Sequence, residues 1–199
     1  MELQTTVENL RHRGFLVSVY NTGEEAAAAI AGALHGKTIG IGGSVTIDTL
    51  GLYPRLSRDN TVYWHWKQQP VEEVRQKATA AEIYLSSANA IAESGEIVNI
   101  DGTGNRVAAL MYGHEKVYII AGINKITPDL ESAIFRARNV AAPLNTRRIG
   151  LKTPCAEGEL KCWDCGSPER ACRGISILLE KMGGIRETEV ILIREKLGY

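Results

Sequence analysis

The sequence has no excess of charge of either sign and no long apolar run. Lysine and arginine together number 23, as do aspartate and glutamate. Because binding to nucleic acid or to an anionic membrane depends on clustered positive charge, we expect neither among the partners of this protein. The longest apolar stretch, residues 26–34, is much shorter than the roughly 20 residues of a transmembrane helix, so we expect no membrane span. The expected partner is a small molecule or another protein.

Cysteine is absent from the first 154 residues. Residues 1–8 are mixed polar, without a basic patch followed by an apolar core, so we expect no secretory signal and a cytoplasmic location. Thiols are kept reduced in the cytosol, which argues against structural disulfides. The histidines His12, His35, His65 and His114 are scattered without the spacing of metal ligands, and we assign them no site.

All four cysteines fall within one eighteen-residue segment. Cys155, Cys162, Cys165 and Cys172 follow the spacing C-x6-C-x2-C-x6-C, and the central C-x2-C turn lets two thiolates point at one metal ion or cluster iron. The pattern favours a metal centre over a redox-active dithiol or inert thiols, because thiols that only fill a core have no reason to cluster. Zinc and a 4Fe-4S cluster both accept four thiolates, so the choice between them stays open.

Short apolar runs of strand composition alternate with helical stretches along most of the 199 residues. The alternation predicts a single α/β domain, residues 1–199, with an open Rossmann-like fold in which helices flank a mainly parallel sheet. Expected strands are residues 15–20, 37–42, 62–66, 82–86, 116–122 and 189–194, and expected helices are residues 22–36, 70–80, 105–112 and 127–140. Residues 91–101 indicate a β-hairpin at the rim of the sheet, and residues 150–175 a cysteine-rich C-terminal loop inserted into the domain.

The expected strand 37–42 runs directly into a glycine turn that is followed by a short helix. Gly42, Gly43, Ser44 and Thr46 occupy this turn. Glycines permit the close approach of a ligand, and a strand-to-helix turn offers unpaired backbone N–H groups beside the two hydroxyls. The turn therefore predicts a site for phosphate or carboxylate, with an ordinary βα turn as the alternative. The missing GKS/T triplet argues against a P-loop nucleotidase.

A second glycine loop, residues 101–106, follows the expected hairpin and opens another helix. Ligands of open α/β sheets bind beyond the carboxyl ends of the strands, so we expect both loops to border one crevice. We expect Arg106 to pair with an anion and Asp101 to act as a base or accept a hydroxyl; a surface ion pair and a helix cap are the alternatives. The loop adds Gly102, Gly104 and Asn105 to the predicted ligand site.

Further candidates stand at the ends of other expected strands. Glu93, at the tip of the hairpin, is a candidate acid or base, with an exposed glutamate as the alternative. Asn89 follows a buried strand at the same rim, and Asn124 and Lys125 follow another. A lysine at such a position can neutralise the charge of a substrate. The predicted ligand is therefore a small anionic metabolite.

Several segments taken together resemble the LUD family, the lactate-utilisation domain proteins that include the LutC type. The resemblance rests on TIGIGGSVT (38–46), ANAIAESGEIVNIDGTGNR (88–106), IAGINK (120–125), APLN (142–145) and the cysteine segment through residue 168. The cysteine-containing form resembles a subgroup once described as a domain of unknown function. The similarity extends from about residue 17 to residue 199.

The resemblance implies a fold similar to the NagB/RpiA/CoA transferase-like superfamily, which includes ribose-5-phosphate isomerase. In those relatives a glycine-serine turn like residues 42–44 binds phosphate, and loops like residues 93–95 and 101–106 line the active site. Proteins of the LutC type belong to an iron–sulfur system that oxidises L-lactate to pyruvate, which implies iron–sulfur redox partner subunits. The cysteine quartet is not a general feature of the family.

Three functional hypotheses follow. The first is a LUD-domain protein of lactate or organic-acid utilisation that binds an anionic ligand at the glycine loops and a metal or cluster at the cysteines. The second is an isomerase or transferase acting on a sugar phosphate or CoA ester, with Glu93 or Asp101 as base and a structural zinc. The third is a noncatalytic subunit whose cysteine loop docks an electron-transfer partner. A homodimer is the expected assembly of a small α/β protein.

Overall fold

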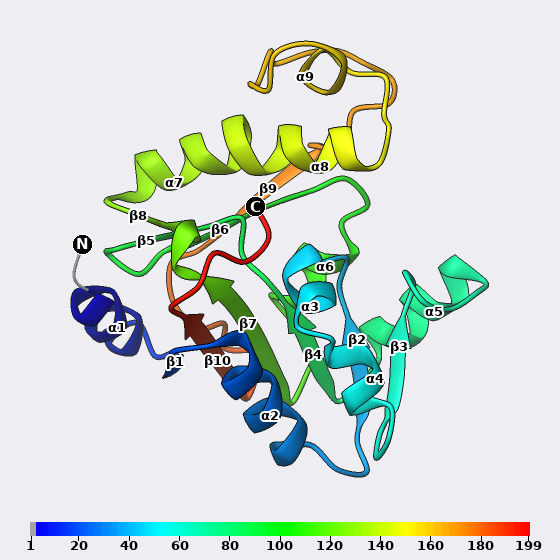
Figure 1. Cartoon of the computed structure of the whole chain (residues 1–199), viewed down its shortest axis with the longest axis vertical. Helices are drawn as coiled ribbons and strands as arrows, with labels where there is room; N and C mark the ends of the chain where they lie inside the picture. Colours follow the sequence, from blue (N-terminus) through cyan, green and yellow to red (C-terminus); the bar gives the residue numbers. More distant parts are fainter. Residues whose placement is uncertain (1–2) are drawn as a thin grey trace.

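A computed structural model describes residues 3–199, which form two β-sheets with flanking helices (Figure 1). The larger sheet has the strand order β1-β10-β7-β4-β2-β3, and every neighbouring pair is parallel. Its strands are β1 (Leu16–Tyr20), β2 (Thr38–Ile41), β3 (Thr61–Trp64), β4 (Ile83–Ser86), β7 (Lys116–Gly122) and β10 (Glu187–Ile193). The helices are α1 (Leu3–His12), α2 (Gly23–Ala33), α3 (Val45–Thr49), α4 (Leu52–Leu56), α5 (Val71–Thr79), α6 (Asn105–Ala109), η1 (Ile123–Lys125), α7 (Leu130–Arg136), η2 (Ala137–Ala141), α8 (Ala142–Arg148) and α9 (Pro154–Glu157). The mainly parallel α/β fold expected from the sequence is confirmed.

Both faces of the large sheet are buried. Successive residues of a strand point to opposite faces, so Tyr118 and Ile120 of β7 pack with α2, α3 and α4 on one side. Val117 and Ile119 pack on the other side, with apolar residues of α1 and α6. Double-sided burial explains why these strands are continuous apolar runs in the sequence.

The predicted hairpin lies in a second sheet rather than at the rim of the first. Strands β5 (Ala90–Ala92) and β6 (Ile97–Asp101) pair antiparallel, and the sheet order is β8-β5-β6-β9. Strand β8 (Ile126–Thr127) follows η1, and β9 (Gly174–Leu178) follows the cysteine segment. The rim placement was wrong because β9, which pairs antiparallel with β6, comes from more than 70 residues further along the chain and was not predicted.

The helix expected to end near residue 140 continues to Arg148, with Pro143 inside it. Segments α7, η2 and α8 follow one another without interruption and run along the second sheet (Figure 1). Proline has no N–H to donate, and the π-helical turns of η2 directly before Pro143 accommodate the missing hydrogen bond. Between residues 3 and 199, no helix has the length and apolar character needed to cross a membrane.

Candidate functional site

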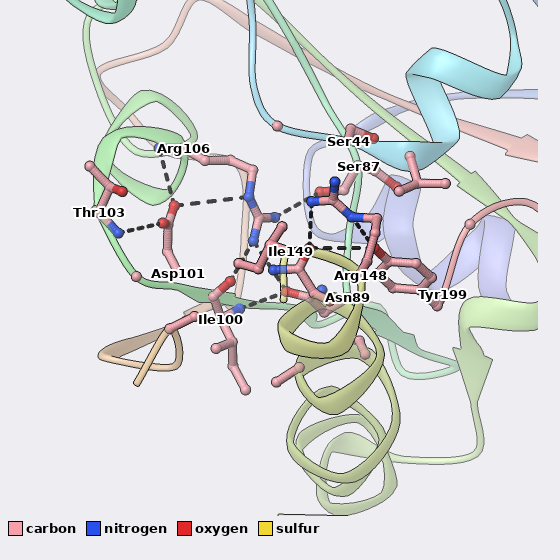
Figure 2. Close-up of a pocket in the computed structure, with 18 of the residues that line it drawn as sticks. Ser44, Ser87, Asn89, Ile100, Asp101, Thr103, Arg106, Arg148, Ile149 and Tyr199 are labelled. Atoms are coloured by element: carbon pink, nitrogen blue, oxygen red, sulfur yellow. Dashed lines mark hydrogen bonds and ion pairs between the residues drawn. The ribbon is translucent and has the colours of Figure 1, made fainter. Parts of the chain in front are cut away.

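A cavity of about 400 Å³, here called the pocket, lies where strands of both sheets end. Ser44 follows β2, Ser87 follows β4 and Asp101 ends β6, and all three line the pocket. Arg148 of α8 and Tyr199 line it as well (Figure 2). The pocket thus lies beyond the carboxyl ends of parallel strands, where open α/β sheets bind their ligands.

Most ligand-site residues predicted from the sequence line the pocket. They are Gly43, Ser44, Thr46, Asn89, Asp101, Gly102, Asn105, Arg106 and Lys125. Four predicted residues, all within the part of the chain that the structure describes, lie outside its wall: Gly42, Glu93, Gly104 and Asn124. Glu93 follows β5 at the tip of the hairpin, whereas Asp101 stands at the opposite end of β6. The structure therefore separates the two carboxylates that were expected to do acid–base work.

The first glycine turn forms as predicted, because β2 passes through it into α3. Its glycines are closely packed by neighbouring side chains: a Cβ on Gly42 would lie 3.1 Å from Tyr84 Oη, and one on Gly43 would lie 3.1 Å from Trp66 Nε1. The Ser44 hydroxyl caps α3 by accepting a hydrogen bond of 3.2 Å from the N–H three residues on. The turn is a closely packed wall of the pocket, and both of its hydroxyls are engaged, because Thr46 Oγ1 donates to Leu197 O at 3.3 Å.

Asp101 serves its own loop as a cap. Its carboxylate accepts backbone N–H groups from Thr103 at 3.0 Å, Gly104 at 3.1 Å, Arg106 at 3.2 Å and Val107 at 3.2 Å. These four donors occupy both oxygens, and the side chain is only 11% exposed. The contacts are those of the helix cap named above as the alternative for Asp101.

Arg106 points inward and ties the surrounding segments together (Figure 2). Its guanidinium donates to Ser87 O at 3.3 Å, Asn89 Oδ1 at 3.3 Å, Asn99 Oδ1 and Ile100 O. Burial lowers the pKa of Arg106, and the carboxylate of Asp101 opposes that effect; an arginine remains charged under such conditions because its ordinary pKa is so high. Arg106 therefore adds positive charge to the pocket while its donors are occupied by the protein.

Two arginines that the sequence did not single out also line the pocket. The Arg148 guanidinium stacks 4.5 Å from the centre of the Trp66 ring, and its Nε donates to Tyr199 Oη at 2.6 Å. Arg75 of α5 lies 3.4 Å from Glu72 through Nη1. Its Nε is buried and has no hydrogen-bond partner within residues 3–199. An unpartnered buried donor at a pocket wall indicates a place for an acceptor group.

The charge of the pocket is positive. Arg75, Arg106 and Arg148 line it, whereas Asp101 is the only aspartate or glutamate among its described lining residues. A cleft lined by charge of one sign raises the local concentration of ions of the other sign. The pocket is therefore suited to anions.

Lys125 lies at the base of the pocket and is only 3% exposed. Its ammonium nitrogen is 3.0 Å from Thr46 Oγ1, 2.8 Å from Ser87 Oγ and 3.0 Å from Ala88 O. Burial, followed by the charges of Arg136 and Arg106, lowers the pKa of Lys125 to about 7. Since both forms of the amine are populated near neutral pH, Lys125 can hold or release a proton at this position.

Some lining residues carried no usable signal in the sequence. His65 was assigned no site and Trp66 was expected to be part of a strand, but β3 ends at Trp64 and both residues turn toward the pocket. Arg75 and Arg148 come from helices whose packing no local pattern predicts. Ser87 was accessible to the same reasoning that selected Asn89, because both follow a buried strand.

The four cysteines line a second, smaller cavity of about 20 Å³ between α8 and the cysteine segment. Figure 1 shows that segment, with α9, beyond the last turns of α8. Cys155 Sγ lies 3.3 Å from the hydroxyls of Thr146 and Thr153. Within residues 3–199, no three histidine, cysteine, aspartate or glutamate side chains are grouped closely enough to hold a single metal ion.

Two arginines approach the sulfur atoms of the small cavity. Arg138 Nη2 lies 3.5 Å from Cys162 Sγ, and Arg170 Nε lies 3.3 Å from Cys172 Sγ. The contact with Cys172 raises the pKa of Arg170. Both guanidinium groups are placed to donate a hydrogen bond to sulfur.

The small cavity and the pocket share part of their walls, because Ala142, Thr146 and Cys172 line both. The backbone joins them as well: Arg173 N donates to Asp101 O at 2.9 Å. The cysteine segment is thus built against the second glycine loop.

Comparisons with known proteins agree with this architecture. The sequence model described as the LUD domain matches residues 3–193. Among solved structures, a crystal structure of a DUF162 family protein from Deinococcus radiodurans superposes with a TM-score of 0.55 at 14% identity, covering 96% of this chain and 95% of that chain. At that identity the likeness concerns the fold alone. No curated protein matches the sequence.

Proposed function

The chain belongs to the LUD domain family, and from the charge of its pocket we propose that it binds a small carboxylate- or phosphate-bearing metabolite there. The proposal includes a part in the utilisation of lactate or a related organic acid, and a metal centre at the four cysteines. The observation that carries it is the set of three arginines opposed by one carboxylate, Asp101, around the pocket.

The arginines differ in what they offer a ligand. Arg106 contributes positive charge to the pocket but does not offer its donors to a ligand, because its guanidinium donates to other parts of the protein. Arg75 has an unpartnered Nε, and Arg148 is held in place by Trp66 and Tyr199. A fixed planar guanidinium suits the two oxygens of a carboxylate or phosphate. The volume of about 400 Å³ is at the small end for ligand sites, which favours a small metabolite.

The arrangement of carboxylates speaks against the isomerase hypothesis. That hypothesis assigns the base to Glu93 or Asp101, which must then have a free carboxylate within reach of the substrate. Asp101 accepts four N–H groups, and Glu93 lies outside the pocket wall. The organic-acid hypothesis has no such requirement.

The cysteines suit a 4Fe-4S cluster better than a lone zinc ion. Zinc binds sulfur at about 2.3 Å, so its four thiolates must gather around one point. Here all four cysteines border one cavity, but no three potential ligands within residues 3–199 are gathered for a single ion. A cluster takes one thiolate on each of four irons, which spreads the sulfurs apart. When bound, it would supply one-electron transfer beside the pocket, with Cys172 in the shared wall.

Calorimetric titration with L-lactate, pyruvate and inorganic phosphate tests the pocket. We expect at least one of them to bind, and Arg148→Ala to weaken binding roughly 10-fold or more, the usual effect of losing a hydrogen bond to a charged group. Arg58→Ala is the matched control, because Arg58 is exposed and lies outside the pocket. Equal affinity in wild type and Arg148→Ala would contradict the proposed site, as would the failure of all three anions to bind.

Metal analysis of anaerobically purified protein, with its visible absorption spectrum, tests the cysteine centre. We expect iron, acid-labile sulfide and the broad charge-transfer absorption of a cluster, all lost in the Cys162→Ser/Cys165→Ser double variant. Trp163→Phe is the control, since it alters the residue between these cysteines and keeps every thiol. Stoichiometric zinc without iron would exclude the cluster, and protein free of both metals would exclude the centre.

A further inference from the structure

Ser87 and Lys125 form a buried polar pair at the base of the pocket. Lys125 Nζ lies 2.8 Å from Ser87 Oγ, and both residues line the pocket. Ser87 is 6% exposed. The serine hydroxyl has only long contacts to other acceptors, 3.4 Å to Thr46 Oγ1 and 3.5 Å to Ala88 O. The lysine nitrogen is therefore its nearest partner.

The lysine of this pair has no counter-ion among the residues that the structure describes. No carboxylate within residues 3–199 lies at ion-pair distance from Lys125, and the charged groups that face it are Arg106 from α6 and Arg136 from α7. A buried lysine is normally paired with an acid, because an unpaired buried charge is costly. Two positive neighbours increase that cost further. The environment therefore favours the neutral amine, which is the form that can accept a proton.

The amine is also held in a fixed position. Thr46 Oγ1 and Ala88 O each lie 3.0 Å from Lys125 Nζ, on segments that follow β2 and β4. Covalent catalysis uses a nucleophile, a base at hydrogen-bond distance from it, and further groups that orient the base. Serine–lysine pairs of this kind occur on several folds.

We propose that Ser87 and Lys125 are a nucleophile and its general base, and that the pocket accepts an ester or thioester of a small organic acid. The arginines would hold the anionic end of such a substrate. This activity goes beyond the proposed anion binding and does not require the metal centre.

The proposed step balances as follows. Ser87 Oγ forms a bond to the acyl carbon while its proton moves to Lys125 Nζ. The bond from that carbon to the alkoxide or thiolate leaving group breaks, and the leaving group takes the proton back from the ammonium. A water molecule, activated by the same amine, then hydrolyses the acyl-serine and releases the acid. No electrons are exchanged with a cofactor.

Incubation of the whole protein with p-nitrophenyl acetate tests the pair. We expect a burst of p-nitrophenolate and an acetyl group that peptide mass mapping places on Ser87. The rate of acylation should rise with pH through about 7, as the amine loses its proton. Ser87→Ala should remove both the burst and the label, and Lys125→Met should slow acylation by about 100-fold or more.

Two variants separate catalysis from folding and from charge. Ser86→Ala is the matched control, because Ser86 is buried next to Ser87 but does not line the pocket, and it should acylate like the wild type. Lys125→Arg is positively charged and cannot act as a base near neutral pH, so it should bind anions yet acylate slowly. Thermal unfolding shows whether each variant is folded.

The pair is refuted if folded Ser87→Ala or Lys125→Arg retains the wild-type burst, or if the label lies elsewhere. Anion titration of the same proteins reports on the pocket separately, so the failure of one proposal leaves the other testable.

Discussion

The carboxylate of Asp101 accepts four backbone N–H groups, and its removal leaves a partly buried turn without these acceptors. We expect Asp101→Ala to lower the free energy of unfolding by about 2 kcal/mol, the combined effect of a lost cap and unsatisfied donors. Urea denaturation measures the change. Asp59→Ala is the control, since the Asp59 side chain is 63% exposed and its loss should matter by less than about 0.5 kcal/mol. Equal effects of the two variants would show that Asp101 is free for another purpose.

The surroundings of single residues explain why several residues predicted to contact a ligand contact other parts of the protein instead. Gly42 and Gly43 were selected because glycine permits close approach, and the structure confirms close approach, but by Tyr84 and Trp66. Arg106 was selected as an anion binder, and its donors are taken up by the protein. A sequence shows which residues are able to make such contacts, whereas the identity of the partner depends on packing.

At the scale of elements, the continuous helix formed by η2 and α8 contributes side chains to the walls of both cavities. Thr146 contacts the thiol of Cys155, and Arg148 stacks on Trp66 at the pocket. The two side chains stand two residues apart on α8 and so point in different directions around its axis. The π-helical turns of η2 set the rotation of α8 relative to α7. The register of α8 is therefore expected to control both sites at once.

Insertion of one alanine between Leu144 and Asn145, within α8, tests this register. Each residue of an α-helix turns it by about 100°, so the insertion rotates Thr146 and Arg148 by about that angle relative to α7. We expect the insertion variant to keep its helical circular dichroism and to lose both anion binding and bound metal. Val140→Ala, at a residue that is 38% exposed, keeps the register and should retain both. An insertion variant that still binds the anion would show that the register of α8 does not position the pocket.

At the scale of the whole molecule, the sequence predicted the parallel sheet because doubly buried strands such as β7 are continuous apolar runs. It did not predict the second sheet, because β9 has exposed residues such as Ile175 and is defined mainly by its pairing with β6. The pocket was predicted from strand ends, which is a local signal. Arg75 and Arg148 reach it from helices whose docking only the tertiary structure determines.

The shared wall of the two cavities leads to a prediction about thiol reactivity. Cys172 lines both the pocket and the small cavity, whereas Cys162 and Cys165 line only the small cavity. An anion bound in the pocket should therefore shield Cys172 from iodoacetamide in reduced, metal-free protein and leave the thiols of Cys162 and Cys165 unprotected. We expect the alkylation of Cys172 to slow about threefold or more at saturating anion, measured by peptide mass mapping over time.

The protecting anion is whichever of lactate, pyruvate or phosphate binds in the titrations. In Arg148→Ala the protection should appear only at higher anion concentration, because the anion binds more weakly. Equal slowing of all three thiols would mean that the anion tightens the whole segment instead of covering one wall, and no slowing would mean that the cavities are separate when the pocket is filled.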